Sequence, residues 1–304
     1  MLYDLIIIGA GPAGLSAGLY AGRKKIKALI LTKQIGGQSL SYTIENYPGL
    51  MEISGLELVE KTKKQVEKYN VEIKESAEIS NIDKKNGNFS VKTEKGNSFE
   101  TKAIIIASGK IPRKINVPGA REFEGKGVSF CTICDAPIFS GKNIAVVGGG
   151  NSALMSAMDL IPYAEKIYVL QHRERFIGDE ILQEKLKKSG KVEFITNAEI
   201  LEIKGNKFVE KIIYEDLVSK EKKELAVGGV FVNIGYIPNT AFVKNFLKLN
   251  EKEEIIIDPW TAETSIKGIF AAGDATNISF KQYIIAAGEG AKAALSAYHY
   301  ICNC

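Results

Sequence analysis

The sequence is poor in several residue types, and each shortage excludes a class of protein. Four cysteines in 304 residues are too few for a disulfide framework, and two histidines leave few ligands for a metal site. The net charge of +4 is spread along the chain without a basic stripe, which argues against a nucleic-acid partner. The uncharged stretch 5–22 contains five glycines and Pro12, which a membrane span would not be expected to carry. Asp4 precedes the stretch, where a signal peptide would have lysine or arginine. We therefore expect a cytoplasmic protein that has no targeting segment and contacts neither nucleic acid nor membrane.

An internal repeat organises the chain. The apolar run 2–8 is typical of a parallel strand buried on both faces, and a glycine-rich turn and a small-residue helix follow it. A second strand at 26–32 completes a βαβ unit. The same pattern restarts at 143–147, with another glycine turn, a helix and a strand at 166–170. The two turns are 139 residues apart (148 − 9 = 139), which indicates duplication of one unit and not a short-period repeat.

The first turn, Gly9-Ala-Gly-Pro-Ala-Gly14, has the GxGxxG pattern between a strand and a helix. Glycine is needed there for the tight turn, for close approach of the backbone to a pyrophosphate, and for packing of the helix on the strand. A turn that serves packing alone is the alternative, but the strand context and the duplication favour nucleotide binding. Leu31 and Thr32 stand where an acidic residue would bind a ribose, so ribose recognition at this turn must come from elsewhere.

The second turn, Gly148-Gly-Gly-Asn-Ser-Ala153, matches the looser GxGxxA form and also follows a strand. Its specificity element should lie beyond the next strand, in Gln171-His-Arg-Glu-Arg175. An acidic residue there favours NADH, because it binds the ribose hydroxyls, whereas arginines favour the phosphate of NADPH. This segment has two arginines, Arg173 and Arg175, and one acidic residue, Glu174, so it favours binding of the NADPH phosphate. A solvated charge run that caps the strand is the alternative.

These patterns predict an α/β protein with two Rossmann-like three-layer nucleotide-binding domains, the second inserted into the first. Hydrophobic residues make up 45% and charged residues 25% of the chain, which is typical of a globular protein with a full core. A long small-residue helix from about Lys281 resembles a return to the first domain. We assign 1–113 and 242–304 to the first domain and 114–241 to the second.

Cys131-Thr-Ile-Cys134 lies close before the second glycine turn (148 − 134 = 14), and its spacing lets two thiols close a small disulfide ring. A zinc site would need further ligands, but His172, His299 and the tail cysteines have no recognisable spacing, so we expect no metal. A dithiol beside two nucleotide sites instead indicates electron flow from cofactor to cofactor to disulfide. Asp135 could move the proton of thiol–disulfide exchange, or simply cap the following turn.

Further motifs accompany these three: Gly36-Gly37-Gln38, Glu45-Asn46-Tyr-Pro-Gly49, and Gly273-Asp274 followed by Lys281-Gln282. Together they resemble the low-molecular-weight thioredoxin reductases over essentially the whole chain. The C-terminal third is also similar to the flavoprotein part of alkyl hydroperoxide reductases. Those proteins carry an extra N-terminal thioredoxin-like module, and its absence here favours a reductase that acts on a separate thioredoxin-type partner.

The resemblance implies a homodimeric thioredoxin-disulfide reductase that moves electrons from NAD(P)H through FAD and a Cys131–Cys134 disulfide to a thioredoxin or thioredoxin-like protein. It implies that Cys134 faces the flavin, that Cys131 attacks the partner's disulfide, and that Asp135 is the acid/base. The residues that it implies for FAD are Gly9, Gly11, Pro12, Ala13, Gly14, Gly37, Gln38, Asn46, Gly273, Asp274, Lys281 and Gln282. Those for the pyridine nucleotide are Gly148, Gly150, Asn151, Ser152, Ala153, Arg173 and Arg175.

One segment departs from the family pattern. NADPH-using members carry His-Arg-Arg-x-x-x-Arg after the second strand of the nucleotide domain, and in that register only Arg173 matches here, with Arg175 as a substitute. NADPH is therefore expected, with NADH or ferredoxin as alternative electron donors. An oxygen-using dithiol oxidase and a non-catalytic flavin redox sensor are alternative functions. The sequence leaves open the protein partner, the resting domain orientation, and whether Cys302 and Cys304 form a second redox pair or, as we favour, a mobile tail.

Overall fold

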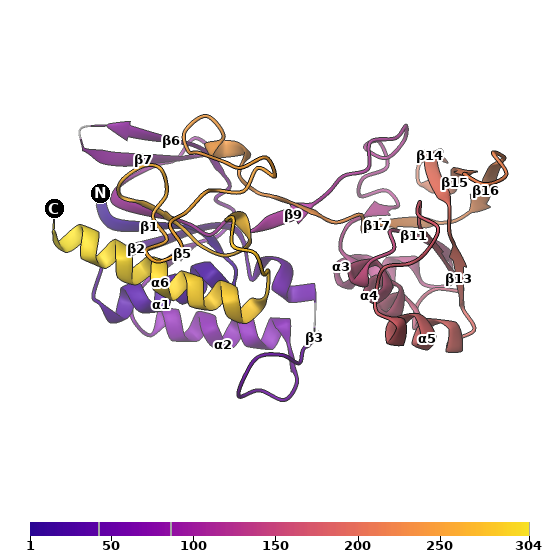
Figure 1. Ribbon diagram of the computed structural model, residues 1–304, viewed down its shortest axis with the longest axis horizontal. Coiled ribbons are helices and arrows are strands. Elements are labelled where there is room, and N and C mark those ends of the chain that lie inside the picture. Colours follow the sequence, from indigo (N-terminus) through magenta and orange to yellow (C-terminus); the bar gives the residue numbers. More distant parts are fainter. Residues whose placement is uncertain (42, 86, 304) are drawn as a thin grey trace. The chain divides into compact units, whose positions relative to one another are not determined.

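The chain folds into two units, which are described separately below (Figure 1). The computed structural model describes residues 1–41, 43–85 and 87–303. The first unit contains Met1–Ile111 and resumes at Ile237, and the second contains Pro112–Tyr236. The first unit resumes there because the backbone N–H of Asn239 donates to Gly109 O (2.9 Å) and the Thr240 hydroxyl donates to Glu253 O (2.7 Å). The predicted insertion of one α/β unit into another is confirmed, whereas the cofactor that each unit binds stays a prediction.

The first unit is built on a sheet with the strand order β5-β2-β1-β8-β7-β6, in which β19 also pairs with β8. The strands are β1 (Leu2–Ala10), β2 (Ala28–Ile35), β5 (Glu72–Lys74), β6 (Ile79–Lys85), β7 (Asn88–Thr93), β8 (Ser98–Ile106) and β19 (Ile269–Ala271). β5, β2, β1, β8 and β19 pair in parallel, whereas the β6–β7 hairpin joins β8 in antiparallel fashion. Burial on both faces explains the apolar runs at residues 5–8 of β1, 28–31 of β2 and 103–106 of β8.

The helices α1 (Pro12–Arg23), α2 (Gly55–Glu67) and α6 (Tyr283–Cys302) gather along one side of this sheet (Figure 1). Small residues let α1 and α6 approach closely, since a Cβ at Gly290 would lie 2.0 Å from Ala13 O. Ser54 caps α2 by accepting from the N–H of Glu57 (3.2 Å). Shorter elements complete the unit: η1 (Gly37–Ser41), β3 (Thr43–Ile44), β4 (Ile53–Ser54), η3 (Ala241–Val243) and η4 (Gly273–Ala275).

The second unit has a fully parallel sheet with the order β10-β17-β11-β12-β13. Its strands are β10 (Val128–Ser129), β11 (Asn143–Val147), β12 (Lys166–Leu170), β13 (Val192–Ile195) and β17 (Gly229–Val232). The helices are α3 (Thr132–Asp135), η2 (Ala136–Phe139), α4 (Asn151–Leu160) and α5 (Glu180–Lys188). A separate antiparallel sheet contains β14 (Ala198–Gly205), β15 (Val209–Asp216) and β16 (Lys222–Ala226).

The two faces of the second sheet are covered by different layers, as Figure 1 shows. Along β11, Ile144 and Val146 belong to a core formed with α4 and α5, whereas Ala145 and Val147 belong to a core formed with β14 and β15. This alternation follows from the two-residue period of a strand. The prediction of Rossmann-like three-layer units is thereby confirmed, with an antiparallel sheet as the third layer of this one.

The two chain segments that join the units pair with each other. β9 (Lys110–Pro112) and β18 (Tyr236–Pro238) form a two-stranded ribbon, and the N–H of Arg113 donates to Gly235 O (2.9 Å). Among the helices that the structure describes, none combines the length and the apolar character needed to cross a membrane.

Candidate active site

The glycines of the first turn have two different roles. Gly9 has a positive φ of 102°, and a Cβ there would lie 2.3 Å from Ala107 O, while a Cβ at Gly14 would lie 1.9 Å from Gly9 O. Both positions therefore need glycine for the fold itself. Gly11 differs, because a Cβ there would meet no atom within 4 Å. Gly11 precedes α1, and no described side chain caps that helix, so its first N–H groups have no side-chain partner and are available to a pyrophosphate.

The C-terminal motif lies against this turn. A Cβ at Gly273, the first residue of η4, would lie 3.0 Å from the Cβ of Ala13. Gly273, and with it the η4 turn that contains Asp274, therefore lies against the first glycine turn. The arrangement fits a dinucleotide whose phosphates lie at the start of α1.

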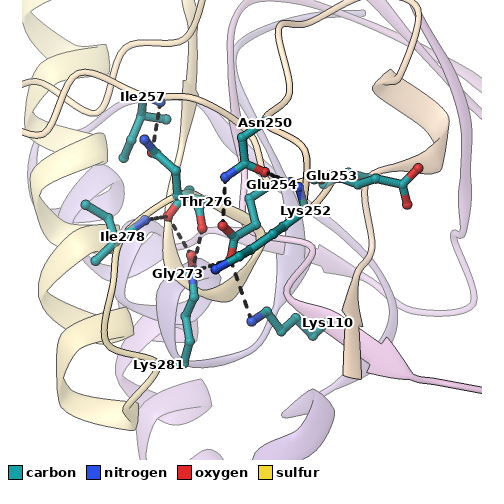
Figure 2. A network of polar contacts seen from close by, with 12 residues as sticks. Lys110, Asn250, Lys252, Glu253, Glu254, Ile257, Gly273, Thr276, Ile278 and Lys281 are labelled. Atoms are coloured by element: carbon teal, nitrogen blue, oxygen red, sulfur yellow. Dashed lines mark hydrogen bonds and ion pairs between the residues drawn. The ribbon is translucent and has the colours of Figure 1, made fainter. Parts of the chain in front are cut away.

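Asp274 interacts electrostatically with Lys110, Lys281 and Glu254. Figure 2 shows the contacts that join these two lysines to the Glu254 carboxylate. Glu254 pairs with Lys281 (3.3 Å) and with Lys110 (3.9 Å), and its carboxylate accepts from the amide of Asn250 (2.9 Å). The Lys281 ammonium also donates to Thr276 O. The three charged side chains are only 13% to 19% exposed, so these contacts fix the segment between η4 and α6. The sequence analysis missed Glu254 and Lys110, because neither belongs to a motif.

Burial sets the direction of the pKa shift for two members of this cluster, Asp274 and Lys281. It raises the pKa of Asp274, although the charges of Lys110 and Lys281 act in the opposite direction. Burial likewise lowers the pKa of Lys281 in spite of its pairing with Glu254. For Glu254 burial alone would raise the pKa, but the hydrogen bond from Asn250 and the two lysines outweigh it and lower the pKa. Charge pairing therefore outweighs burial at Glu254 alone.

Four further predicted residues of the first unit lie outside its main sheet and long helices: Gly37 and Gln38 in η1, Asn46 after β3, and Gln282 directly before α6. Asn46 and Gln282 meet through a hydrogen bond from Asn46 Nδ2 to Gln282 Oε1 (3.2 Å), although they are 236 residues apart. The amide of Gln38 donates to Lys110 O in β9 (2.6 Å). Gly37, in η1, has a positive φ of 53° with no atom within 4 Å of a Cβ. The structure therefore brings Asn46 to Gln282 and holds Gln38 to the backbone of β9.

The second glycine turn repeats the geometry of the first. Gly148 has a φ of 138°, and a Cβ there would lie 2.2 Å from Asn233 O. A Cβ at Gly149 would lie 2.1 Å from Nε2 of Gln171, which is 4% exposed. At Gly150 a Cβ would meet no atom within 4 Å, and no described side chain caps α4. The second turn thus also leaves a helix N-terminus open to phosphates.

The predicted specificity residues lie beside this turn. Residues 172–175 are exposed after β12, and no carboxylate of the described chain pairs with Arg173 or Arg175. Asn151 and Ser152 begin α4, and the side-chain oxygen of Asn151 accepts from the N–H of Asp179 (2.7 Å). The Asn151 side chain therefore holds the loop between β12 and α5. Its backbone N–H is left as the group that Asn151 can offer to a phosphate.

Cys131 and Cys134 form a disulfide at the start of α3, with a Cα–Cα distance of 5.4 Å. Cys131 is half-buried and Cys134 is exposed. The buried hydroxyl of Thr132 donates to the buried hydroxyl of Ser156 in α4 (2.7 Å). The disulfide segment is thereby attached to the same helix that begins at the second glycine turn.

Ser129 holds Asp135 in place. Its hydroxyl donates to Asp135 Oδ2 (2.6 Å) and accepts from the N–H of Cys131 (3.1 Å), and the residue is 5% exposed. Asp135 lines a cavity of about 230 Å³ together with Lys126 and Lys142. Ser129 thus fixes the position of the Asp135 carboxylate, and Asp135 borders a cavity. The sequence analysis missed Ser129 and Thr132, whose only signal was their place next to the cysteines.

Other arrangements of reactive groups are absent from the described residues. They contain no cluster of three or more His, Cys, Asp or Glu side chains that could hold a metal ion. Cys302 is an exposed free thiol near the end of α6, and Cys304 lies outside the described part of the chain. The Cys131–Cys134 disulfide is therefore the redox-active group that the geometry supports.

Comparisons with known proteins agree with this geometry. The family model described as pyridine nucleotide-disulphide oxidoreductase matches residues 3–290. The chain is 39% identical to a subunit of alkyl hydroperoxide reductase of Escherichia coli (strain K12) and 37% identical to NADH dehydrogenase of Bacillus subtilis (strain 168). Each match covers 98% of this chain and 58% of the relative, so the chain spans little more than half the length of these curated relatives.

Solved structures match along the whole chain. Thioredoxin reductase from Lactococcus lactis is 36% identical with a TM-score of 0.92, and the match covers 99% of this chain and 100% of that one. Thioredoxin reductase from T. acidophilum is 34% identical with a TM-score of 0.89 and 98% coverage of both chains. The resemblance to thioredoxin reductases is thereby confirmed, and it implies a flavin and a nicotinamide cofactor. This chain belongs to the pyridine nucleotide-disulphide oxidoreductase family.

Proposed function

We propose that the chain is an FAD-dependent thioredoxin-disulfide reductase, which moves electrons from NADPH through FAD and the Cys131–Cys134 disulfide to a thioredoxin-type protein. NADH is the alternative electron donor. The observation that carries the proposal is the presence, within one unit, of this disulfide and of a glycine turn that leaves the N-terminus of α4 uncapped. The likeness to solved thioredoxin reductases supports the same activity.

FAD is assigned to the first unit. When bound, FAD supplies a two-electron relay between the pyridine nucleotide and the disulfide. The open space at Gly11 and the uncapped start of α1 support a pyrophosphate there. The residues that we propose to hold it are Gly9, Gly11, Pro12, Ala13, Gly14, Gly37, Gln38, Asn46, Gly273, Asp274, Lys281 and Gln282.

The pyridine nucleotide is assigned to the second unit, at Gly148, Gly150, Asn151, Ser152 and Ala153. Arg173 and Arg175 are the proposed ligands of the NADPH phosphate. Both are exposed, and neither guanidinium is engaged by a described carboxylate, so both are available to an added phosphate. The homodimer implied by the family resemblance stays a prediction.

Cys131 and Cys134 perform the exchange with the partner. After reduction to two thiols, the Cys131 thiolate attacks one sulfur of the partner's disulfide, which forms a mixed disulfide and releases a partner thiolate. Asp135 supplies the proton that this thiolate takes up, and the cavity beside Asp135 lets water reload it. Cys134 then attacks Cys131 Sγ, which releases the reduced partner and restores the Cys131–Cys134 disulfide.

The test is NADPH-dependent reduction of a purified thioredoxin disulfide, measured by the appearance of partner thiols. Wild-type protein should support turnover, whereas Cys131→Ser and Cys134→Ser should each abolish it while retaining flavin. Cys302→Ser is the matched control and should retain full activity, because Cys302 lies at the end of α6. Turnover by Cys131→Ser at the wild-type rate would rule the proposal out.

A second candidate is the reductase role of an alkyl hydroperoxide reductase system. It is favoured by the 40% identity to the alkyl hydroperoxide reductase of Pseudomonas aeruginosa, which exceeds the 36% identity to the Lactococcus lactis thioredoxin reductase. Both candidates use the same disulfide and differ in the protein that receives the electrons. Faster reduction of an isolated thioredoxin-like module of an alkyl hydroperoxide reductase than of thioredoxin would favour the second candidate.

A further inference from the structure

We propose that Asn233 is a ligand of the pyridine nucleotide, and that its side-chain oxygen accepts a hydrogen bond from a ribose hydroxyl next to the pyrophosphate. This inference rests on the proposed function, because it deepens the nucleotide site at the second glycine turn. Neither the sequence motifs nor the family resemblance assigns a role to Asn233.

Asn233 lies where the strand order of the second sheet reverses. β11 has β12 on one side and β17 on the other, and Asn233 follows β17 directly. Open parallel sheets bind ligands at the carboxyl ends of their strands at such a switch point. The N–H of Asn233 donates to Val147 O (2.8 Å), and a Cβ at Gly148 would lie 2.2 Å from Asn233 O. The residue therefore adjoins the glycine turn itself.

The side chain of Asn233 has an unfulfilled acceptor. Its Oδ1 is buried, and no described group of the protein donates a hydrogen bond to it. Buried polar side-chain atoms in folded proteins nearly always have a partner, because water has been removed and must be replaced. A buried acceptor without a donor, in a residue whose backbone adjoins a nucleotide turn, indicates that the ligand supplies the partner.

The first unit provides an internal comparison. There the N–H of Ala107 donates to Ile8 O (2.8 Å), and a Cβ at Gly9 would lie 2.3 Å from Ala107 O. Ala107 thus occupies in the first unit the place that Asn233 occupies in the second, with the same backbone contacts. Because alanine satisfies the fold at that place, the polar side chain of Asn233 is not required for folding.

The chemistry of the acceptor identifies the ligand group. Phosphate oxygens carry no donor at neutral pH, so a carbonyl oxygen cannot pair with the pyrophosphate at the start of α4. The hydroxyl groups of the two riboses are the donors adjacent to the pyrophosphate. The other donors of the coenzyme are the adenine amino group, which the adenosine ribose separates from the pyrophosphate, and the nicotinamide amide, which is distinguished below by a ligand that lacks nicotinamide.

The test uses Asn233→Ala, which installs the residue found at the equivalent place in the first unit, in flavin-loaded full-length protein. Affinities are measured for NADP⁺ and for 2′-phospho-ADP-ribose, or for NAD⁺ and ADP-ribose if the wild type prefers them. Loss of one hydrogen bond should weaken both ligands about 3- to 10-fold. Asn206→Ala, on the exposed β14–β15 turn, is the control and should change neither affinity.

Thermal unfolding separates a binding role from a structural one. Without nucleotide, Asn233→Ala should unfold at or above the wild-type temperature, because the removed acceptor has no partner, and the stabilisation by added nucleotide should shrink. A lower unfolding temperature with unchanged affinities would overturn the inference. If only NADP⁺ bound more weakly and 2′-phospho-ADP-ribose did not, the donor to Asn233 would be the nicotinamide amide, and the proposed contact with a ribose hydroxyl would be wrong. If Asn233→Ala fails to fold, Asn233→Leu, which keeps the side-chain volume, is measured in the same way. Wild-type protein that binds neither coenzyme would instead contradict the proposed function.

Discussion

Alanine at Gly11 or Gly150 should stabilise the cofactor-free protein but weaken binding of a cofactor. Gly11 and Gly150 have φ values of −77° and −95°, and a Cβ at either would meet no atom within 4 Å. Alanine is therefore compatible with the backbone, and by restricting the unfolded chain it should stabilise the cofactor-free protein by ~0.4–1 kcal/mol. The added methyl group occupies the space through which a pyrophosphate approaches the helix N-terminus.

Each substitution should remove one cofactor and leave the other. Loss of charge-assisted hydrogen bonds of ~1.5–3 kcal/mol predicts binding weakened about 10- to 150-fold. Gly11→Ala should lose flavin, measured by absorbance per chain. Gly150→Ala should retain flavin but need far more NADPH to reduce it.

Gly14→Ala is the structural control. Its Cβ would lie 1.9 Å from Gly9 O, so this variant should lower the unfolding temperature even without cofactor. If Gly150→Ala bound NADPH and NADH as tightly as wild type does, the second turn would not be a phosphate site. The same reasoning about the first turn would fail if Gly11→Ala retained stoichiometric flavin.

Three further outcomes are expected. Ser129→Ala removes a hydrogen bond of ~1.5–3 kcal/mol to the Asp135 carboxylate. The kcat for disulfide reduction should therefore fall about 10- to 150-fold, with an unchanged KM for the coenzyme. A kcat equal to that of the wild type would show that Asp135 needs no positioning by Ser129. The pKa of Glu254 is lowered from its ordinary value of 4.5, so its contribution to stability is present above pH 4.5 and is lost as the pH falls through the folded-state pKa. Glu254→Gln should therefore reduce the fall in unfolding temperature at acid pH. An unchanged fall would contradict the pairing of Glu254 with the lysines. Arg173→Ala with Arg175→Ala should weaken NADPH about 10-fold or more relative to NADH in coenzyme titrations, whereas equal weakening of both would exclude recognition of the phosphate.

The sequence predicts the units and their glycine turns because both are local properties. Apolar runs mark strands buried on two faces. Glycine marks positions such as Gly9 and Gly148, where the backbone has a positive φ and lies against the residue that follows a neighbouring strand. The Cys131–Cys134 pair is likewise visible from spacing. The return of the chain to the first unit follows from the small-residue helix α6, which packs on α1.

Contacts between distant segments could not be predicted in this way. Glu254 reaches Lys281 across an intervening strand and loop, and Asn233 reaches the second glycine turn only through the pairing of β17 with β11. The antiparallel layer of β14 to β16 was also missed, because its strands are partly exposed and lack long apolar runs. Such features depend on tertiary pairing, which a single motif does not encode.

The central claim is that electrons from the pyridine nucleotide reach the Cys131–Cys134 disulfide through the flavin. Anaerobic titration with NADPH, with thiols counted after each addition, tests it directly. The account predicts that wild-type protein takes up about two equivalents, bleaches the flavin band and gains about two thiols, whereas Cys131→Ser with Cys134→Ser takes up about one and gains none. Flavin that is bleached by NADPH or NADH without any new thiols in the wild type would contradict it.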